Sequence, residues 1–191
     1  MPKYPGTRAI HASSSEPKLQ QFEREFGHVV PKHFRDFLLT TNGVCFEAPY
    51  SFPLREYWLR EHKEDPKMYP PVRWPPDHIE LIPETVTDRV ALIKGLAAGT
   101  PVTVEDKYVS LSAVDKSYGF HDRLPLDLLL IGYTTENDVL CLGCAGRRSG
   151  RVYVWGSGWF DFPPEDAING LQLVAESFKQ FWDELIVDVE D

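Results

Sequence analysis

Residues 124–155 constrain the fold of this chain more than any other stretch, because they hold three short apolar runs separated by turn-forming residues. The runs cover 126–133, 139–142 and 152–155, and the third is rich in β-branched and aromatic residues, as strands are. The segments between them contain the Gly, Asn, Asp and Ser residues that tight turns need. We therefore expect three antiparallel strands, whose apolar face needs a helix to cover it.

Two amphipathic helices are expected near the N-terminus. The first covers residues 16–26, where large apolar residues recur on one helical face, and Gly27 ends it. The second begins at Pro31, a residue that suits a helix start, and ends at Asn42-Gly43, since both residues tolerate the left-handed conformation that follows many helices. A short strand over the next few residues, 44–48, would lead into the rest of the chain.

Helical periodicity also predicts two later helices. One covers 88–98, with Thr87 as its N-cap. The other covers 167–186, where apolar residues follow the i, i+3, i+4, i+7 pattern throughout, and it is the strongest helix signal in the chain. A hairpin is expected between 102–104 and 108–111.

The chain is expected to form one domain of the α+β class, given its 191 residues. A central, mostly antiparallel sheet would be covered by the N-terminal helix pair and the C-terminal helix. Residues 1–15 are expected to be a loose lead-in, and 16–191 the domain. A Pro-rich insertion at about 49–123 would interrupt it, with 113–123 as a loop at its end.

Charge is distributed unevenly along the chain, whose net charge is −9. Residues 159–191 carry nine Asp and Glu against a single basic residue, Lys179, whereas residues 1–158 are close to balance. This distribution argues against direct binding of nucleic acid, which needs a basic surface. It suits a basic protein partner steered by charge, although an acidic segment that only keeps the protein soluble explains it equally simply.

Few residues suggest chemistry. Cys141 and Cys144 form a C-x-x-C pair, but the pair lies at a strand end with no second pair and no His pair to complete a zinc site, so we expect packing residues. No catalytic Ser elbow or phosphate-binding loop is present. The sequence therefore predicts a non-enzymatic protein with no cofactor and no metal.

Localisation follows from what the sequence lacks. No apolar run approaches the ~18 residues that a membrane helix needs, and the N-terminus has no apolar signal-peptide core. We expect a cytoplasmic protein with no membrane contact, whose three cysteines are reduced.

The chain resembles the SUKH superfamily in two blocks, 16–48 and 124–186. In the first block the resemblance rests on apolar, Gly and Pro positions in order: Leu19, Phe22, Phe26, Gly27, Pro31, Phe34, Phe37, Leu38, Asn42 and Gly43. In the second it rests on Ile131-Gly132, the run 138–142, the run 152–155, and the closing Ser177, Phe178 and Phe181. Many members have a Gly-rich acidic turn before the second strand, whereas residues 134–138 of this chain contain no Gly.

The resemblance implies a binding protein rather than an enzyme. Bacterial members resemble immunity proteins that neutralise a cognate toxin, often a nuclease, and fungal relatives resemble regulators and adaptors in cell-wall synthesis. Because nuclease toxins are basic, the acidic segment 159–191 suits the immunity role.

Two functional hypotheses follow. The first is a protein-binding surface in which aromatic anchors are ringed by acids, a composition typical of interface hot spots. Its residues would be Trp159, Phe160, Asp161, Glu165, Asp166, Glu136 and Asp138. The second is a small-molecule or catalytic pocket under the insertion at 49–83, lined by Trp58, Tyr69 and Trp74. A third role, that of a regulatory adaptor, also follows from the resemblance.

Overall fold

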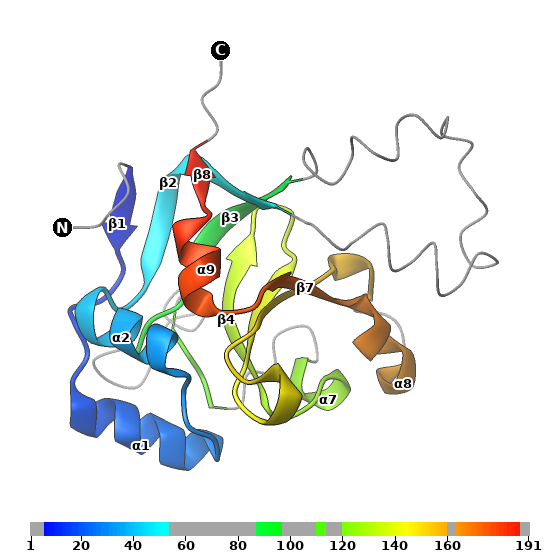
Figure 1. Ribbon diagram of the computed structural model, residues 1–191, viewed down its shortest axis with the longest axis horizontal. Coiled ribbons are helices and arrows are strands. Elements are labelled where there is room, and N and C mark those ends of the chain that lie inside the picture. The colour runs from blue at the N-terminus through cyan, green and yellow to red at the C-terminus, as the bar shows by residue number, and fades with distance from the viewer. Residues whose placement is uncertain (1–5, 54–86, 97–109, 114–119, 160–162, 188–191) are drawn as a thin grey trace.

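A computed structural model describes residues 6–53, 87–96, 110–113, 120–159 and 163–187, and all structural statements below concern these residues. They form an antiparallel sheet of eight strands in the order β1-β2-β3-β4-β5-β6-β7, in which β8 also pairs with β2 (Figure 1). The strands are β1 (Thr7–Ala9), β2 (Val44–Pro53), β3 (Thr87–Ile93), β4 (Leu128–Thr134), β5 (Val139–Gly143), β6 (Val152–Trp155), β7 (Leu171–Ala175) and β8 (Ile186–Val187).

Helices lie on both sides of this sheet, and the predicted α+β class is confirmed. The helices are α1 (Glu16–Phe26), α2 (Lys32–Thr40), α7 (Phe120–Arg123), α8 (Pro164–Ala167) and α9 (Phe178–Asp183), with 3-10 turns η2 (Gly146–Arg148), η3 (Ser157–Trp159) and η4 (Ile168–Gly170). Figure 1 shows α1, α2 and α9 grouped away from α7 and α8. The three central strands expected from the sequence, β4, β5 and β6, are present at the expected places.

The central strands are buried on both faces, so they separate two hydrophobic cores. Along β5 and β6 the side chains alternate between the cores, as the two-residue period of a strand requires. The first core, under α1, α2 and α9, includes Leu19, Phe34, Leu140, Leu142, Val152, Val154, Phe178 and Phe181. The second core, under α7 and α8, includes Phe120, Leu128, Val139, Cys141, Tyr153, Trp155 and Ala167.

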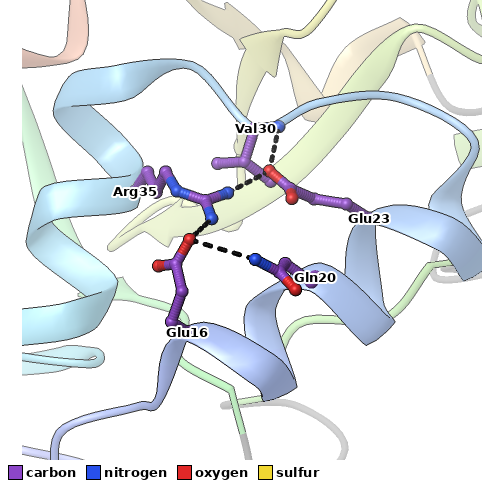
Figure 2. A network of polar contacts seen from close by, with 5 residues as sticks. All are labelled: Glu16, Gln20, Glu23, Val30 and Arg35. Carbon is purple, nitrogen blue, oxygen red and sulfur yellow. Dashed lines mark hydrogen bonds and ion pairs between the residues drawn. The ribbon is translucent and has the colours of Figure 1, made fainter.

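The N-terminal helix pair forms as predicted and is joined by a polar network. Gly27 ends α1 with a φ of 83°, in the left-handed region that glycine adopts readily. The Glu23 carboxylate accepts hydrogen bonds from the Val30 backbone N–H at 2.9 Å and from Arg35 Nη1 at 2.5 Å. Arg35 also pairs with Glu16, so this guanidinium holds carboxylates from both ends of α1 (Figure 2).

The corner at Asn42-Gly43 ties three parts of the chain together. Asn42 is buried and has a φ of 56°. Its side-chain Nδ2 donates to the carbonyls of Ala12 at 2.6 Å and Leu96 at 2.9 Å, and its Oδ1 accepts from the Leu96 N–H at 2.7 Å. The backbones approach so closely here that a Cβ at Gly95 would overlap the Asn42 carbonyl. The corner therefore joins the N-terminal segment, the end of α2 and the end of β3.

The helix predicted over 88–98 is wrong, because this segment contains β3. The strand fills the place between β2 and β4 in the sheet. Val90 and Ile93 both face the first core, and their separation of three residues is the i, i+3 spacing of a helix. In the strand the same spacing arises from a register irregularity between Val90 and Leu92, which shifts the alternation of faces by one residue.

A C-terminal helix is present as predicted, but it is the short α9; the long continuous helix over 167–186 is wrong, because the segment forms η4, β7 and α9 in succession. Gly170 ends η4, and β7 then pairs with β6. Ser177 caps α9, with its Oγ accepting from the Gln180 N–H at 3.1 Å. Val174 on β7 and Phe178 on α9 face the same core, which explains why the spacing imitates one continuous helix.

Smaller differences lie at the ends of other segments. Part of the expected loose lead-in forms β1, which pairs with β2. β2 is longer than the expected strand 44–48, and the expected loop 113–123 ends in α7. The expected hairpin at 102–111 lies mostly outside the described residues, apart from Ser110, which bridges Gly95, and Leu111, which is buried.

Candidate functional site

Two loops that carry predicted partner-binding residues meet at one end of the central sheet. The turn between β4 and β5 contains Glu136 and Asp138, and the turn after β6 ends at Trp159. Val139 and Trp155 are opposite each other in the sheet register, so both turns leave the sheet at the same end. A hydrogen bond joins them directly, since Asp138 Oδ1 accepts from the Ser157 backbone N–H at 2.6 Å.

The β4–β5 turn is ordered by its own polar groups, although it contains no Gly. Asn137 adopts a φ of 66°, a left-handed conformation that Asn tolerates better than most residues. The Thr134 hydroxyl accepts hydrogen bonds from the N–H groups of Glu136 at 3.3 Å and Asp138 at 3.1 Å. The turn thus leaves the Glu136 side chain exposed and the Asp138 side chain half-buried.

Trp159 is half-buried and packs at the edge of the second core. Its backbone N–H donates to the Gly156 carbonyl at 3.0 Å, which closes the η3 turn. The indole lies on Gly170, where a Cβ would overlap the first atoms of the Trp159 side chain. The sequence left open whether Trp159 packs or binds a partner, and the structure places it with one part packed on Gly170 and another part open to solvent.

Helix α8 is attached to the same end of the sheet. The Trp155 indole Nε1 donates to the Ala167 carbonyl at 2.9 Å inside the second core. Asp166, one residue earlier, is exposed. Glu165 also lies in α8, but its side chain is outside what the structure describes, and the predicted Phe160 and Asp161 lie outside the described residues altogether.

We call the set Glu136, Asp138, Trp159 and Asp166 the strand-end site. It combines one half-buried aromatic ring with three carboxylates from two segments, the β4–β5 turn and α8. The arrangement offers an apolar anchor with carboxylates on segments at the same end of the sheet, which is suited to recognition of a basic surface.

The opposite end of β5 and β6 carries positive charge that the sequence interpretation missed. Residues 146–151, which we call the arginine loop, contain three Arg. Arg148 makes a two-pronged ion pair with Asp127, at 3.1 Å and 2.7 Å, and Arg151 pairs with Glu176 at 2.7 Å. Hydrogen bonding to Asp127 raises the pKa of Arg148. Arg147 is exposed. The run Arg-Arg-Ser-Gly-Arg in the sequence was the available signal.

The cysteines pack as predicted. Cys141 lies in the second core and Cys144 in the first, and both thiols are free. Burial raises the pKa of the Cys141 thiol, and burial together with nearby Asp127 raises the pKa of Cys144 to about 12. Such thiols are poor nucleophiles and poor metal ligands. Across the described ranges, no group of three or more His, Cys, Asp or Glu side chains is arranged to hold a metal ion.

The residues expected to line the alternative pocket, Trp58, Tyr69 and Trp74, lie outside the described residues. In the part of the chain that the structure describes, no helix has the length and apolar character to cross a membrane.

Comparison with known proteins supports the resemblance noted in the sequence. The model of the SMI1 / KNR4 family (SUKH-1) matches residues 14–184, which is most of the chain and includes every residue of the strand-end site. Neither the curated proteins nor the solved structures contain a match to this chain.

Proposed function

Since this chain belongs to the SMI1 / KNR4 family (SUKH-1), we propose that it is a bacterial immunity protein that binds and neutralises a cognate toxin in the cytoplasm. The family is associated with protein–protein interaction, and membership is consistent with an immunity-protein-like or regulatory role. The toxin-neutralising role is the more specific part of the proposal.

The observation that carries the proposal is the strand-end site. Trp159 is a half-buried aromatic ring fixed on Gly170, and rigid aromatic anchors supply much of the binding energy in protein interfaces. Exposed carboxylates of Glu136 and Asp166 come from the segments beside it. With a net charge of −9, the chain would attract a basic toxin, such as a nuclease, by long-range steering.

The test begins with the reading frame adjacent to the gene of this chain. Its product would be expressed alone and together with this protein, and growth and direct binding would be measured. Co-expression is expected to restore growth. Binding is expected to weaken between low and high salt, mainly through a slower association rate, because exposed charges are screened.

Variants assign the binding to the strand-end site. Trp159→Ala is expected to abolish protection, and Glu136→Gln with Asp166→Asn is expected to slow association. Arg147→Ala is the control, because Arg147 is exposed, as Glu136 and Asp166 are, but lies at the other end of β5 and β6. If the Trp159→Ala variant protects cells as well as wild type does, the toxin does not bind at the strand-end site. If the partner binds but does not harm cells when expressed alone, the protein is a regulatory adaptor and the toxin-neutralising role is wrong.

A further inference from the structure

Asp138 and Glu136 lie in one turn, yet the structure gives their carboxylates different surroundings. Glu136 is exposed, and its carboxylate makes no hydrogen bond or ion pair to the part of the chain that the structure describes. Asp138 is half-buried, and its Oδ1 accepts the Ser157 N–H at 2.6 Å, a short distance for a nitrogen donor. The carboxylate of Asp138 is therefore already engaged by a backbone N–H of the neighbouring loop.

The Asp138–Ser157 hydrogen bond joins the two loops just beyond the paired residues Val139 and Trp155, where the sheet pairing of β5 and β6 ends. On one side, Asp138 is held by its own turn, because its backbone N–H donates to the Thr134 hydroxyl at 3.1 Å and its carbonyl accepts from the Thr134 N–H at 2.9 Å. On the other side, Ser157 begins the η3 turn that ends at Trp159. The hydrogen bond thus fixes the first residue of the turn that carries the indole.

The indole is supported from a second direction by glycines. Gly170 has no side chain in the space that the Trp159 ring occupies, and a Cβ at Gly156 would lie 3.6 Å from Trp159 Cδ1. The ring therefore rests on backbone, which holds its position but does not by itself fix the loop that leads to it. Asp138 supplies that second restraint.

We propose that Asp138 is a positioning residue of the strand-end site, which fixes Trp159 through the Ser157 N–H, while Glu136 in the same turn supplies charge to the partner. The partner-binding part of this inference rests on the proposed function. The positioning part concerns the free protein and is tested without any partner.

Two substitutions separate position from charge at residue 138. Asp138→Asn removes the charge but keeps an oxygen of the same reach that accepts the Ser157 N–H. Asp138→Glu keeps the charge but places the carboxylate one methylene farther from the backbone. Glu136→Gln, in the same turn, is the matched control that removes an exposed charge without touching the Ser157 hydrogen bond.

The free-protein readout is the ¹⁹F NMR spectrum after labelling all five Trp with 5-fluorotryptophan, with the Trp159 resonance assigned from Trp159→Phe. Asp138→Glu is expected to shift or broaden the Trp159 resonance, whereas Asp138→Asn and Glu136→Gln leave it near its wild-type position. The other four resonances and the thermal unfolding midpoint serve as the folding control. A Trp159 resonance that stays unmoved in Asp138→Glu would overturn the positioning role.

The second readout is affinity for the toxin of the proposed function. Asp138→Glu is expected to weaken binding by about tenfold, the equivalent of one hydrogen bond, and Asp138→Asn by much less. If Asp138→Asn weakens binding while Asp138→Glu does not, Asp138 acts through its charge and the inference is wrong. If the resonance moves as expected while wild type binds no toxin, the positioning role stands and the proposed function fails.

Discussion

Replacing Asn42 is expected to destabilise the protein more than any other single substitution of a polar side chain at the sheet corner. Asn42→Ala removes three hydrogen bonds, to Ala12 O, Leu96 O and Leu96 N. The Ala12 carbonyl belongs to an exposed residue, and the Leu96 carbonyl keeps a bond from Lys18 Nζ at 3.3 Å. The Leu96 N–H is buried and loses its side-chain partner, so its desolvation is not compensated.

The magnitude follows from these bonds and from the backbone. Three hydrogen bonds at about 1 kcal/mol each give a loss of roughly 3 kcal/mol. Alanine in the left-handed region adds about 1 kcal/mol, because residue 42 has a φ of 56°. Asn42→Ala should therefore lower the free energy of unfolding by roughly 4 kcal/mol, a large part of the 5–15 kcal/mol typical of a folded protein. Asn42→Gly should cost less, because Gly adopts this backbone freely.

The matched control is Asn137, which has a φ of 66° but an exposed side chain. Asn137→Ala should show only the backbone part, about 1 kcal/mol. Urea unfolding, followed by Trp fluorescence, gives the free energy of unfolding of the three variants and of wild type. The comparison holds when the variants share the wild-type dependence of that free energy on urea concentration. The reasoning is refuted if Asn42→Ala costs no more than Asn137→Ala, since the three side-chain hydrogen bonds of Asn42 would then contribute nothing.

Three further predictions test other parts of the structure. Arg35→Met should cost about 1–3 kcal/mol in urea unfolding, because the Glu23 carboxylate, whose side chain is only 12% exposed, loses its charged partner and keeps the Val30 N–H. Lys32→Met, which breaks an exposed pair, should cost under about 1 kcal/mol. Equal costs would contradict the structural role of the network. Gly170→Ala should displace Trp159, destabilise by about 1–3 kcal/mol and shift the fluorescence emission; an unchanged spectrum would contradict the packing. Burial raises the pKa of Cys144 to about 12, so the folded protein keeps a thiol proton that the unfolded chain loses near pH 8.5. The contribution of Cys144 to the free energy of unfolding should therefore be fully present below about pH 8.5 and decrease as the pH rises above it. Cys144→Ala should make the free energy of unfolding fall less steeply with pH. The same pH dependence in wild type and variant would show that the thiol does not contribute.

The sequence predicted those elements whose ends carry local signals. Helix α1 has a Pro in its first turn and Gly27 after its last residue, and its bounds agree with the prediction. The strands β4, β5 and β6 are bounded by turn residues and were likewise predicted. These signals depend on neighbours in the chain, so they are readable without knowledge of the fold.

The two wrong helices show where periodicity stops being informative. In β3 an irregularity moves Val90 and Ile93, three residues apart, onto one face. In the C-terminal segment Val174 on β7 and Phe178 on α9, four residues apart, face the same core although they belong to different elements. The resulting spacing is the same as that of a helix. Only the pairing of β3 with β2 and β4, which involves distant parts of the chain, distinguishes the two structures.

The strand-end site was predictable in composition but not in the roles of its members. The chain's acids and Trp159 were identifiable as candidate contacts. That Asp138 faces Ser157, and that Trp159 rests on Gly170, depends on contacts between loops that sequence spacing does not encode. The arginine loop was overlooked because the charge balance of residues 1–158 concealed a local cluster.

One consequence of the sheet order concerns synthesis of the protein. β1 and β8 pair with the same strand, β2, on the same edge, although they come from opposite ends of the described chain (Figure 1). During translation, β2 and β1 leave the ribosome early, but the edge of β2 beside β8 stays open until residues 186–187 have emerged. An exposed strand edge is prone to pair with other chains. Emergence of β8 is therefore the step that completes this edge of the sheet, and a ribosome stalled before it would hold an aggregation-prone intermediate.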